Sequence, residues 1–184
     1  AREIKNADVF YYTGISAGIH DAKQKKDLIQ IRSTAVTCGF DFNYRSQLHN
    51  DKKVSQLLFK KISENVDINF VSFDDVKELF DIKNPYDVFE ILNDKKNLIL
   101  IRYKDSIIFK NKQEVIKTVK VHHGEVVDTT AAGDAFNGSF LALINNDKNI
   151  SIEENILKSH SVTREVIKHK GAIISNKNMP NINT

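Results

Sequence analysis

The sequence contains almost no cysteine and no tryptophan, and the scarcity of cysteine excludes a disulfide-stabilised scaffold. Cys38 is the only cysteine among 184 residues, so no disulfide can form within the chain. A reducing compartment is the default for such a chain, and we expect a cytoplasmic protein. No apolar run approaches the roughly 18 residues that a membrane-spanning helix needs. Residues Ala1–Lys5 also lack the charged-then-apolar layout of a signal peptide.

An excess of one charge is also missing. The chain carries 27 basic and 24 acidic residues, a net charge of +3. Lysine pairs such as Lys25-Lys26 and Lys52-Lys53 lie in segments of mixed polarity, which is typical of solvated surfaces. A nucleic-acid-binding protein would concentrate such charge on one face. We therefore expect no nucleic acid and no membrane among the partners, and a single globular domain over residues 1–184.

Short apolar runs alternate with segments of helical spacing. We predict strands at residues 8–12, 36–42, 68–71, 97–102, 106–109, 115–121 and 172–174. We predict helices at residues 27–35, 54–62, 73–80, 86–92, 130–144 and 151–168, with a turn at 13–16 and an end at Gly171. Strands that alternate with helices indicate an α/β fold, a largely parallel sheet with helices on both faces. Ligands bind such sheets at the carboxyl ends of the strands, where residues 43–45, 72–75 and 128–134 are polar.

The segment before the predicted helix 130–144 is the most informative. Ala131, Ala132 and Gly133 are small enough for the backbone to approach a ligand, and helix N-termini bind anions such as phosphate. Asp134 follows in the first turn, where its carboxylate can accept a proton from a substrate hydroxyl. The same spacing also suits a simple helix-capping acid. The spacing alone leaves both interpretations open.

The string Asp128-Thr129-Thr130-Ala131-Ala132-Gly133-Asp134 resembles the Asp-Thr-x-Gly-Ala-Gly-Asp signature of the ribokinase-like (PfkB-type) carbohydrate kinases. It departs from that signature only at Ala131, where the family usually has glycine. This variant is frequent in one branch, the 2-keto-3-deoxygluconate kinases. Further segments resemble the same branch in the same order: residues 12–16, 42–48 and 166–174.

The resemblance implies roles for individual residues. Asp134 is expected to be the catalytic base that takes the proton from the primary hydroxyl of a sugar acid, and so to contact the substrate. Ala131, Ala132 and Gly133 are expected to supply the N–H groups of an anion hole. Arg45 would hold a phosphate of ATP or the carboxylate of the substrate, and Asn43 and Tyr44 would line the same site. Taken alone, an arginine after a strand is usually a surface ion-pair residue.

The resemblance also implies a nucleotide site and a metal. ATP with Mg²⁺ is the expected cofactor, and the expected nucleotide contacts are Asn43, Arg45, Arg102, Asp105, Ser106, Thr129 and His160. His160 also suits an ordinary helix residue. Tyr103 stands where the branch has a glycine, and it would either stack near the adenine or obstruct it. Asp75 replaces the glutamate of the family's Asn-x-x-Glu motif near the metal, although two acids in the first turn of a helix explain Asp74 and Asp75 equally well.

Complete kinases of this family have roughly 300 residues in one main domain with a small β lid. The chain therefore resembles the C-terminal portion of such an enzyme, with the N-terminal part and the lid absent, and its open sheet edge predicts a homo-oligomer. The expected activity is ATP-dependent phosphorylation of a sugar or sugar acid, specifically of 2-keto-3-deoxygluconate to its 6-phosphate. Fructose and other keto-sugar kinases share the catalytic loop. The alternative is a truncated, non-catalytic module that binds nucleotide or oligomerises. No Gly-x-Gly-x-x-Gly follows an early strand, which opposes a dehydrogenase.

Overall fold

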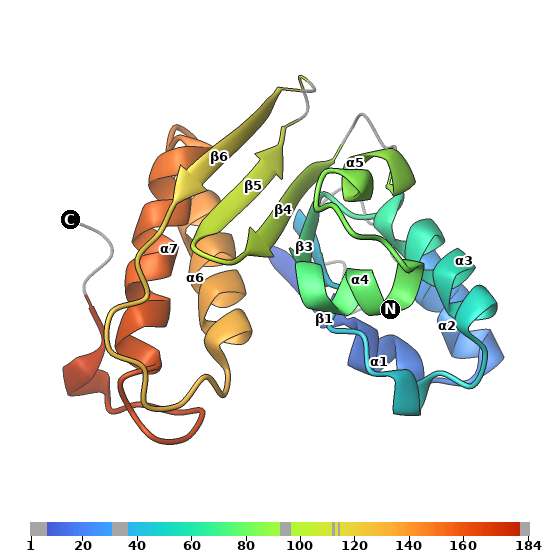
Figure 1. Cartoon of the computed structure of the whole chain (residues 1–184), viewed down its shortest axis with the longest axis horizontal. Coiled ribbons are helices and arrows are strands. Elements are labelled where there is room, and N and C mark those ends of the chain that lie inside the picture. Colours follow the sequence, from blue (N-terminus) through green and yellow to red (C-terminus); the bar gives the residue numbers. More distant parts are fainter. Residues whose placement is uncertain (1–6, 31–36, 93–96, 112, 114, 181–184) are drawn as a thin grey trace. The chain divides into compact units, whose positions relative to one another are not determined.

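The structure, a computed structural model, describes residues 7–30, 37–92, 97–111, 113 and 115–180 (Figure 1). Its contacts separate into two compact units. The first unit comprises Ala1–Lys104 with Ile108–Thr118, and the second comprises Asp105–Ile107 with Val119–Thr184. Each unit is described by itself below.

A sheet of parallel strands forms the frame of the first unit. Its strands are β1 (Val9–Thr13), β2 (Thr37–Asp41), β3 (Ile68–Ser72) and β4 (Leu98–Tyr103). These four strands are parallel and hydrogen-bonded in chain order. The sheet continues in the same order through β5 (Ser106–Lys110) and β6 (Ile116–Lys120). The connections before β5 and β6 are too short for a parallel crossover, so these two strands run antiparallel to their neighbours (Figure 1). The other four strands are parallel, so the sheet is largely parallel, as the sequence predicts.

Short helices connect these strands. They are α1 (Gly14–Ile19), α2 (Ala22–Ile29), α3 (Lys52–Ser63), α4 (Phe73–Phe80) and α5 (Asp87–Ile91), with a single 3₁₀ turn at Ser46–Leu48. Aspartates begin two of the helices: Asp21 accepts a hydrogen bond from the backbone N–H of Gln24, and Asp51 accepts one from that of Val54. Such caps satisfy N–H groups that have no partner inside the helix.

Aromatic side chains form the core of the first unit. Phe40 in β2, Phe42 just after β2, and Phe59 in α3 are fully buried, with ring centroids 5.3–5.6 Å apart. Along β4 the side chains alternate, so that Ile99 belongs to this cluster whereas Leu100 lies on the opposite face and is also buried. Burial of both faces explains why β4 begins with four consecutive apolar residues, 98–101.

Two long helices dominate the second unit. They are α6 (Ala132–Asn146) and α7 (Ile152–Val166), which lie side by side (Figure 1). The buried amide of Asn155 donates a hydrogen bond of 3.1 Å to the carbonyl oxygen of Phe140 and so ties the two helices together. Among the helices that the structure describes, none is both long and apolar enough to cross a membrane.

Three sequence-based predictions are wrong. Residues 13–16 form no turn but the start of α1, where the Thr13 hydroxyl accepts a hydrogen bond from the N–H of Ser16. The helix predicted at 27–35 is α2, which begins at Ala22; residues 31–35 lie outside the described part of the chain. Residues 172–174 are in no strand, and Ile173 is 91% exposed. Three consecutive apolar residues form a strand only where the backbone of a neighbouring strand pairs with them through hydrogen bonds.

Two glycines give a matched test of this packing. A Cβ on Gly14 would overlap the carbonyl oxygen of Phe42 and lie 2.7 Å from Cζ of Phe59, whereas a Cβ on Gly138 would meet nothing within 4 Å. We expect Gly14→Ala to lower the free energy of unfolding by about 1–3 kcal/mol. Gly138→Ala, in the middle of α6, should raise it by about 0.5–1 kcal/mol. Urea unfolding measures both changes, and similar values for the two variants would contradict the packing described here.

Candidate functional site

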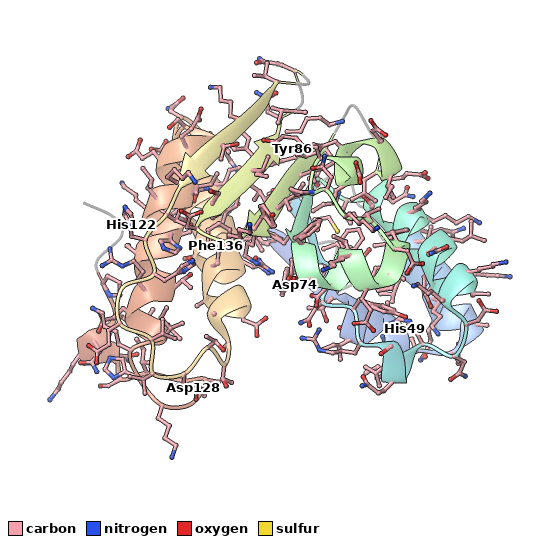
Figure 2. All side chains as sticks on the ribbon, in the orientation of Figure 1. His49, Asp74, Tyr86, His122, Asp128 and Phe136 are labelled. Atoms are coloured by element: carbon pink, nitrogen blue, oxygen red, sulfur yellow. The ribbon has the colours of Figure 1, made fainter. Side chains whose placement is uncertain are left out.

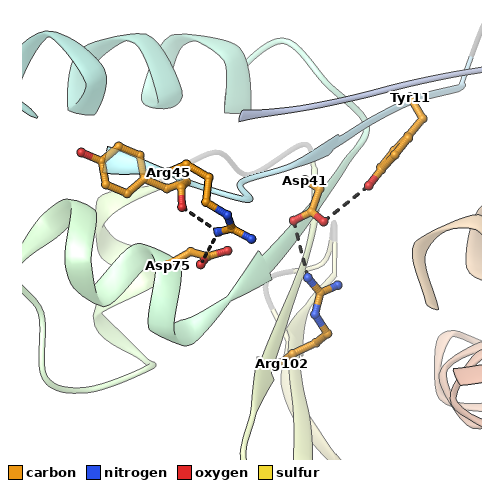
Figure 3. Close-up of polar contacts among 6 residues, drawn as sticks. Tyr11, Asp41, Arg45, Asp75 and Arg102 are labelled. Carbon is orange, nitrogen blue, oxygen red and sulfur yellow. Dashed lines mark hydrogen bonds and ion pairs between the residues drawn. The ribbon is translucent and has the colours of Figure 1, made fainter. Parts of the chain in front are cut away.

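Charged side chains gather at the carboxyl ends of the parallel strands in the first unit (Figure 3). Tyr11 lies in the middle of β1. The others come from a strand end or the residues after it: Asp41 ends β2, Arg45 follows β2, Asp75 lies in the first turn of α4, and Arg102 is near the end of β4. The parallel register places these ends at one edge, since Ser72 lies opposite Arg102 and Thr13 lies opposite Asp41. This is the edge at which open α/β sheets bind their ligands.

Asp41 is a buried carboxylate at the centre of this group. It is 2% exposed and is the last residue of β2. Its Oδ2 accepts a hydrogen bond from the hydroxyl of Tyr11 at 3.4 Å, and its Oδ1 lies 3.5 Å from Nη2 of Arg102. The sequence analysis did not single out Asp41. The signal was present, because an acid that ends an apolar strand is rarely buried without a partner.

Arg45 and Asp75 form a second charged pair at this edge. Nη1 of Arg45 donates to the backbone carbonyl oxygen of Tyr44 at 2.7 Å and to Oδ1 of Asp75 at 3.2 Å. Burial raises the pKa of the Asp75 carboxyl and the charge of Asp41 adds to this, whereas Arg45 and Arg102 lower it. The net direction is upward, so the ion pair does not fully offset the loss of solvent around the carboxylate.

Asn43 and Tyr44 differ in what they offer to this site. Asn43 has a φ of 29°, an uncommon value for a residue with a side chain, and its buried Oδ1 has no hydrogen-bond partner among the described residues. The ring of Tyr44 is buried, stacked on His49 at 5.1 Å and edge-on to Phe59 at 5.8 Å. At this edge Tyr44 offers its backbone carbonyl to Arg45, because its ring packs in the core.

The β4–β5 turn accommodates Tyr103 at the position where the kinases that the sequence resembles have glycine. The left-handed residue of this turn is Lys104, with φ 50°, so Tyr103 does not occupy a backbone conformation that requires glycine. The ring of Tyr103 lies edge-on to Phe73, with centroids 5.0 Å apart. Tyr103 thus extends the packing against α4.

Asp105 and Ser106, two expected nucleotide contacts, interact with each other in the second unit. The Ser106 hydroxyl donates to Oδ1 of Asp105 at 3.3 Å, and Nζ of Lys120 approaches the same carboxylate at 3.3 Å. Hydrogen bonding and charge from Lys120 lower the pKa of Asp105. Both members of this ion pair are well exposed, so a ligand phosphate could reach the lysine.

The loop before α6 is held by one carboxylate. Oδ1 of Asp128 accepts from the N–H of Thr130 at 2.9 Å, and Oδ2 accepts from the N–H of Gly171 at 2.8 Å. Hydrogen bonds from Thr130 and Gly171 lower the pKa of Asp128 to about 2. The N–H groups of Val127 and Asp128 both bond to the carbonyl oxygen of Ile167. The segment after α7 is therefore fixed against this loop.

The start of α6 carries the small residues and the predicted base. Ala131 caps the helix in the left-handed conformation, with φ 61° and ψ 12°, and the N–H of Ala132 bonds to the carbonyl oxygen of Thr129. Asp134 follows in the first turn and is exposed. Within the described residues its carboxylate makes no hydrogen bond and no ion pair. The positive end of a 15-residue helix and an uncommitted carboxylate thus lie together.

His160 is engaged inside the second unit. Its ring is 7% exposed, its Nε2 lies 3.0 Å from the carbonyl oxygen of His122, and it lies edge-on to His123. A carbonyl only accepts, so Nε2 carries the proton. Burial is the main cause that lowers the pKa of His160. These contacts favour the interpretation of an ordinary packed helix residue over that of an adenine contact.

Known proteins share both the sequence pattern and the fold. Residues 1–179 match the family described as pfkB family carbohydrate kinase. The 2-dehydro-3-deoxygluconokinase of Escherichia coli strain K12 is 30% identical over 187 residues, which cover 97% of this chain and 60% of that protein. The enzyme of the same name from Haemophilus influenzae is 32% identical over 180 residues, 94% of this chain and 57% of its own length. The chain thus spans about 60% of the length of these relatives.

A solved structure shows the same fold. The aminoimidazole riboside kinase of Salmonella enterica, determined with aminoimidazole riboside and an ATP analogue, superposes with a TM-score of 0.75 at 21% identity. The match covers 89% of this chain and 57% of that one. The predicted ribokinase-like fold class is confirmed, as part of a larger fold.

Asp128 supplies a test by pH. Its pKa of about 2 in the folded chain lies below the ordinary 3.8, so its contribution to stability is present above about pH 4 and is lost as the pH falls toward 2. Asp128→Asn leaves one acceptor oxygen for two N–H groups and should lower the unfolding midpoint at pH 7. The difference in free energy of unfolding between wild type and Asp128→Asn should shrink from pH 5 to pH 3. A difference that is constant over this range would contradict the assignment.

Ala131 supplies a second test. An alanine in the left-handed conformation is strained by about 1–2 kcal/mol. Glycine removes this strain, but it also makes the unfolded chain more flexible, which cancels part of the gain in stability. Ala131→Gly should therefore raise the free energy of unfolding by up to about 1 kcal/mol. Ala135→Gly, one turn further along α6, should lower it by about 1 kcal/mol. Chemical unfolding of both variants checks the prediction, and equal losses of stability would refute it.

Proposed function

The chain belongs to the pfkB family of carbohydrate kinases, and we propose that it carries the catalytic part of an enzyme that phosphorylates 2-keto-3-deoxygluconate to its 6-phosphate with ATP. The observation that carries this proposal is the uncommitted carboxylate of Asp134 at the positive end of α6. The relatives named 2-dehydro-3-deoxygluconokinase, after the same sugar acid under another name, support this choice of substrate.

The proposed chemistry at α6 is phosphoryl transfer assisted by a base. The hydroxyl oxygen of the sugar acid attacks the γ-phosphorus of ATP, the bond from that phosphorus to ADP breaks, and Asp134 takes the hydroxyl proton. The N-terminus of α6, at Ala131, Ala132 and Gly133, stabilises the negative charge of the phosphoryl group in flight.

Arg45 is the proposed anion receptor of the first unit. Only its Nη1 has partners among the described residues, and its side chain is 48% exposed. Nε and Nη2 form the fork that binds a carboxylate or phosphate by two parallel hydrogen bonds. We assign the sugar acid carboxylate or a phosphate of ATP to this fork and place Asn43 at the same site. Nucleotide contacts are proposed for Arg102, Asp105, Ser106, Thr129 and His160.

Asp75 fits the Mg²⁺ that accompanies ATP. Within the described residues no group of three His, Cys, Asp or Glu side chains could hold a metal. Mg²⁺ does not need such a cage, because it keeps several waters and is held by one or two carboxylates together with substrate phosphates. Oδ2 of Asp75 makes no hydrogen bond to the described residues and could serve in this way. The bound ion would neutralise phosphate charge.

A second candidate function follows from the length of the match. The chain spans 60% and 57% of the relatives named above, so a module that binds nucleotide or oligomerises without catalysis is the alternative. The two functions differ in whether the sugar acid stimulates ADP release.

The base is tested by ADP release from Mg-ATP, measured with and without 2-keto-3-deoxygluconate. Release that depends on the sugar acid should fall at least about 100-fold in Asp134→Asn, because the base is lost and the fold is not. Asp147→Asn, at the other end of α6, is the matched control and should keep wild-type turnover. Turnover by Asp134→Asn within twofold of wild type would show that Asp134 is not the base.

The same assay decides the substrate. Fructose and ribose are tested beside 2-keto-3-deoxygluconate at equal concentrations. Stimulation by fructose alone would overturn the substrate assignment and leave the kinase assignment intact. ATP binding without stimulation by any sugar would favour the non-catalytic module.

A further inference from the structure

The guanidinium of Arg45 is anchored at one corner only. Nη1 donates to the carbonyl oxygen of Tyr44 at 2.7 Å and makes a longer contact of 3.2 Å with Oδ1 of Asp75. The shorter bond fixes the position of the guanidinium, because the carbonyl of the preceding residue stays close to the Arg45 side chain. The remaining donors, on Nε and Nη2, have no partner within the described residues. Arg45 is thus held in place with its forked edge open.

The contact between Arg45 and Asp75 has the character of an exchangeable pair. It joins one nitrogen to one oxygen, and the side chain of Arg45 is 48% exposed while that of Asp75 is 20% exposed. Single contacts at such exposure contribute little to stability, whereas forked contacts are stronger. Oδ2 of Asp75 makes no hydrogen bond to the described residues. This carboxylate is therefore held by one oxygen only.

The charges around this pair are balanced. Arg45 pairs with Asp75 and Arg102 pairs with Asp41, so two cations lie with two anions at this edge (Figure 3). Asp41 is 2% exposed and fixed between Tyr11 and Arg102. Asp75 is the more exposed of the two acids. A bound anion would keep this balance of charge if the Asp75 carboxylate moved away from Arg45.

We propose that Asp75 is an internal competitor for anions at Arg45. Its carboxylate contacts Nη1 of Arg45 in the free protein. A carboxylate or phosphate that binds the open fork of Nε and Nη2 brings a second negative charge to the same guanidinium and drives Asp75 away from Nη1. The inference rests on the proposed function only in assigning an anionic ligand to Arg45. Asp75 is a positioning residue in this exchange: it acts through Arg45, lowers the affinity for anions and leaves both its own oxygens free once the ligand is bound.

Asp74 provides a matched control for this proposal. It precedes Asp75 in the first turn of α4 and is exposed (Figure 2). Within the described residues it makes no hydrogen bond or ion pair. Asp74→Asn and Asp75→Asn therefore remove the same charge from the same turn, and only Asp75→Asn releases Arg45.

The test is calorimetric titration of the chain with 2-keto-3-deoxygluconate and, separately, with inorganic phosphate, both without metal. Asp75→Asn should bind the tighter of these anions about two- to fivefold more strongly than wild type, the factor expected for loss of one exposed ion pair. Asp74→Asn should bind it as wild type does. Asp75→Ser is measured as well, and circular dichroism confirms that each variant folds. Arg45→Ala should abolish the gain in the Asp75→Asn background.

The outcomes separate this proposal from the proposed function. A gain in Asp75→Asn no larger than in Asp74→Asn overturns the exchange, as does a chain that binds neither anion in either form. A gain that survives Arg45→Ala shows that the anion binds elsewhere and overturns it too. The kinase assignment depends on ADP release and on Asp134, so it stands or falls separately.

Discussion

The parallel register of β1 to β4 is the constraint on which the candidate site of the first unit depends. Parallel strands end at one edge, so residues more than ninety positions apart, Tyr11 and Arg102, reach the same carboxylate. A shift of one residue in β2 would turn Asp41 toward the aromatic cluster of Phe40 and Phe59. The buried acid would then have no partner. The apolar pattern that fixes the register therefore also fixes the charges.

The second unit builds its site by a different device. Both oxygens of Asp128 are used, one on Thr130 and one on Gly171, so a single side chain fixes the loop before α6 and the segment after α7. The loop then enters the helix through Ala131 at a positive φ. Strain of this kind persists only where the surroundings define the backbone closely, and it is concentrated at functional sites. The resemblance to a signature with glycine at this position points to the same conformational demand.

Most of the fold follows from the sequence because its apolar patterns are long and regular. The helix Phe73–Phe80 and the strand at 97–102 were predicted to within a residue. The errors have local causes: the N–H of Ser16 finds a cap in Thr13, which turns an expected turn into a helix, and residues 172–174 lack a partner strand. In the site, Arg45 and Asp75 were predicted separately, but their pairing joins the segment after β2 to the first turn of α4, and no local pattern encodes it. Asp41 was missed because it was counted as a residue of the strand, and its partners Tyr11 and Arg102 lie 30 and 61 positions away in the sequence.

Asp41 and Asp75 are carboxylates at the same edge of the sheet, but their burial and contacts differ. Asp41 has contacts on both oxygens and 2% exposure, so moving it would strand a buried charge, which is strongly destabilising. Asp75 has a contact on one oxygen only and remains partly open to solvent, so it can exchange its partner for water or a ligand at small cost. Asp41 pairs with Arg102, and Asp75 contacts one nitrogen of Arg45. A site that must release and rebind an anion needs both, because an unopposed arginine would hold any anion that it met.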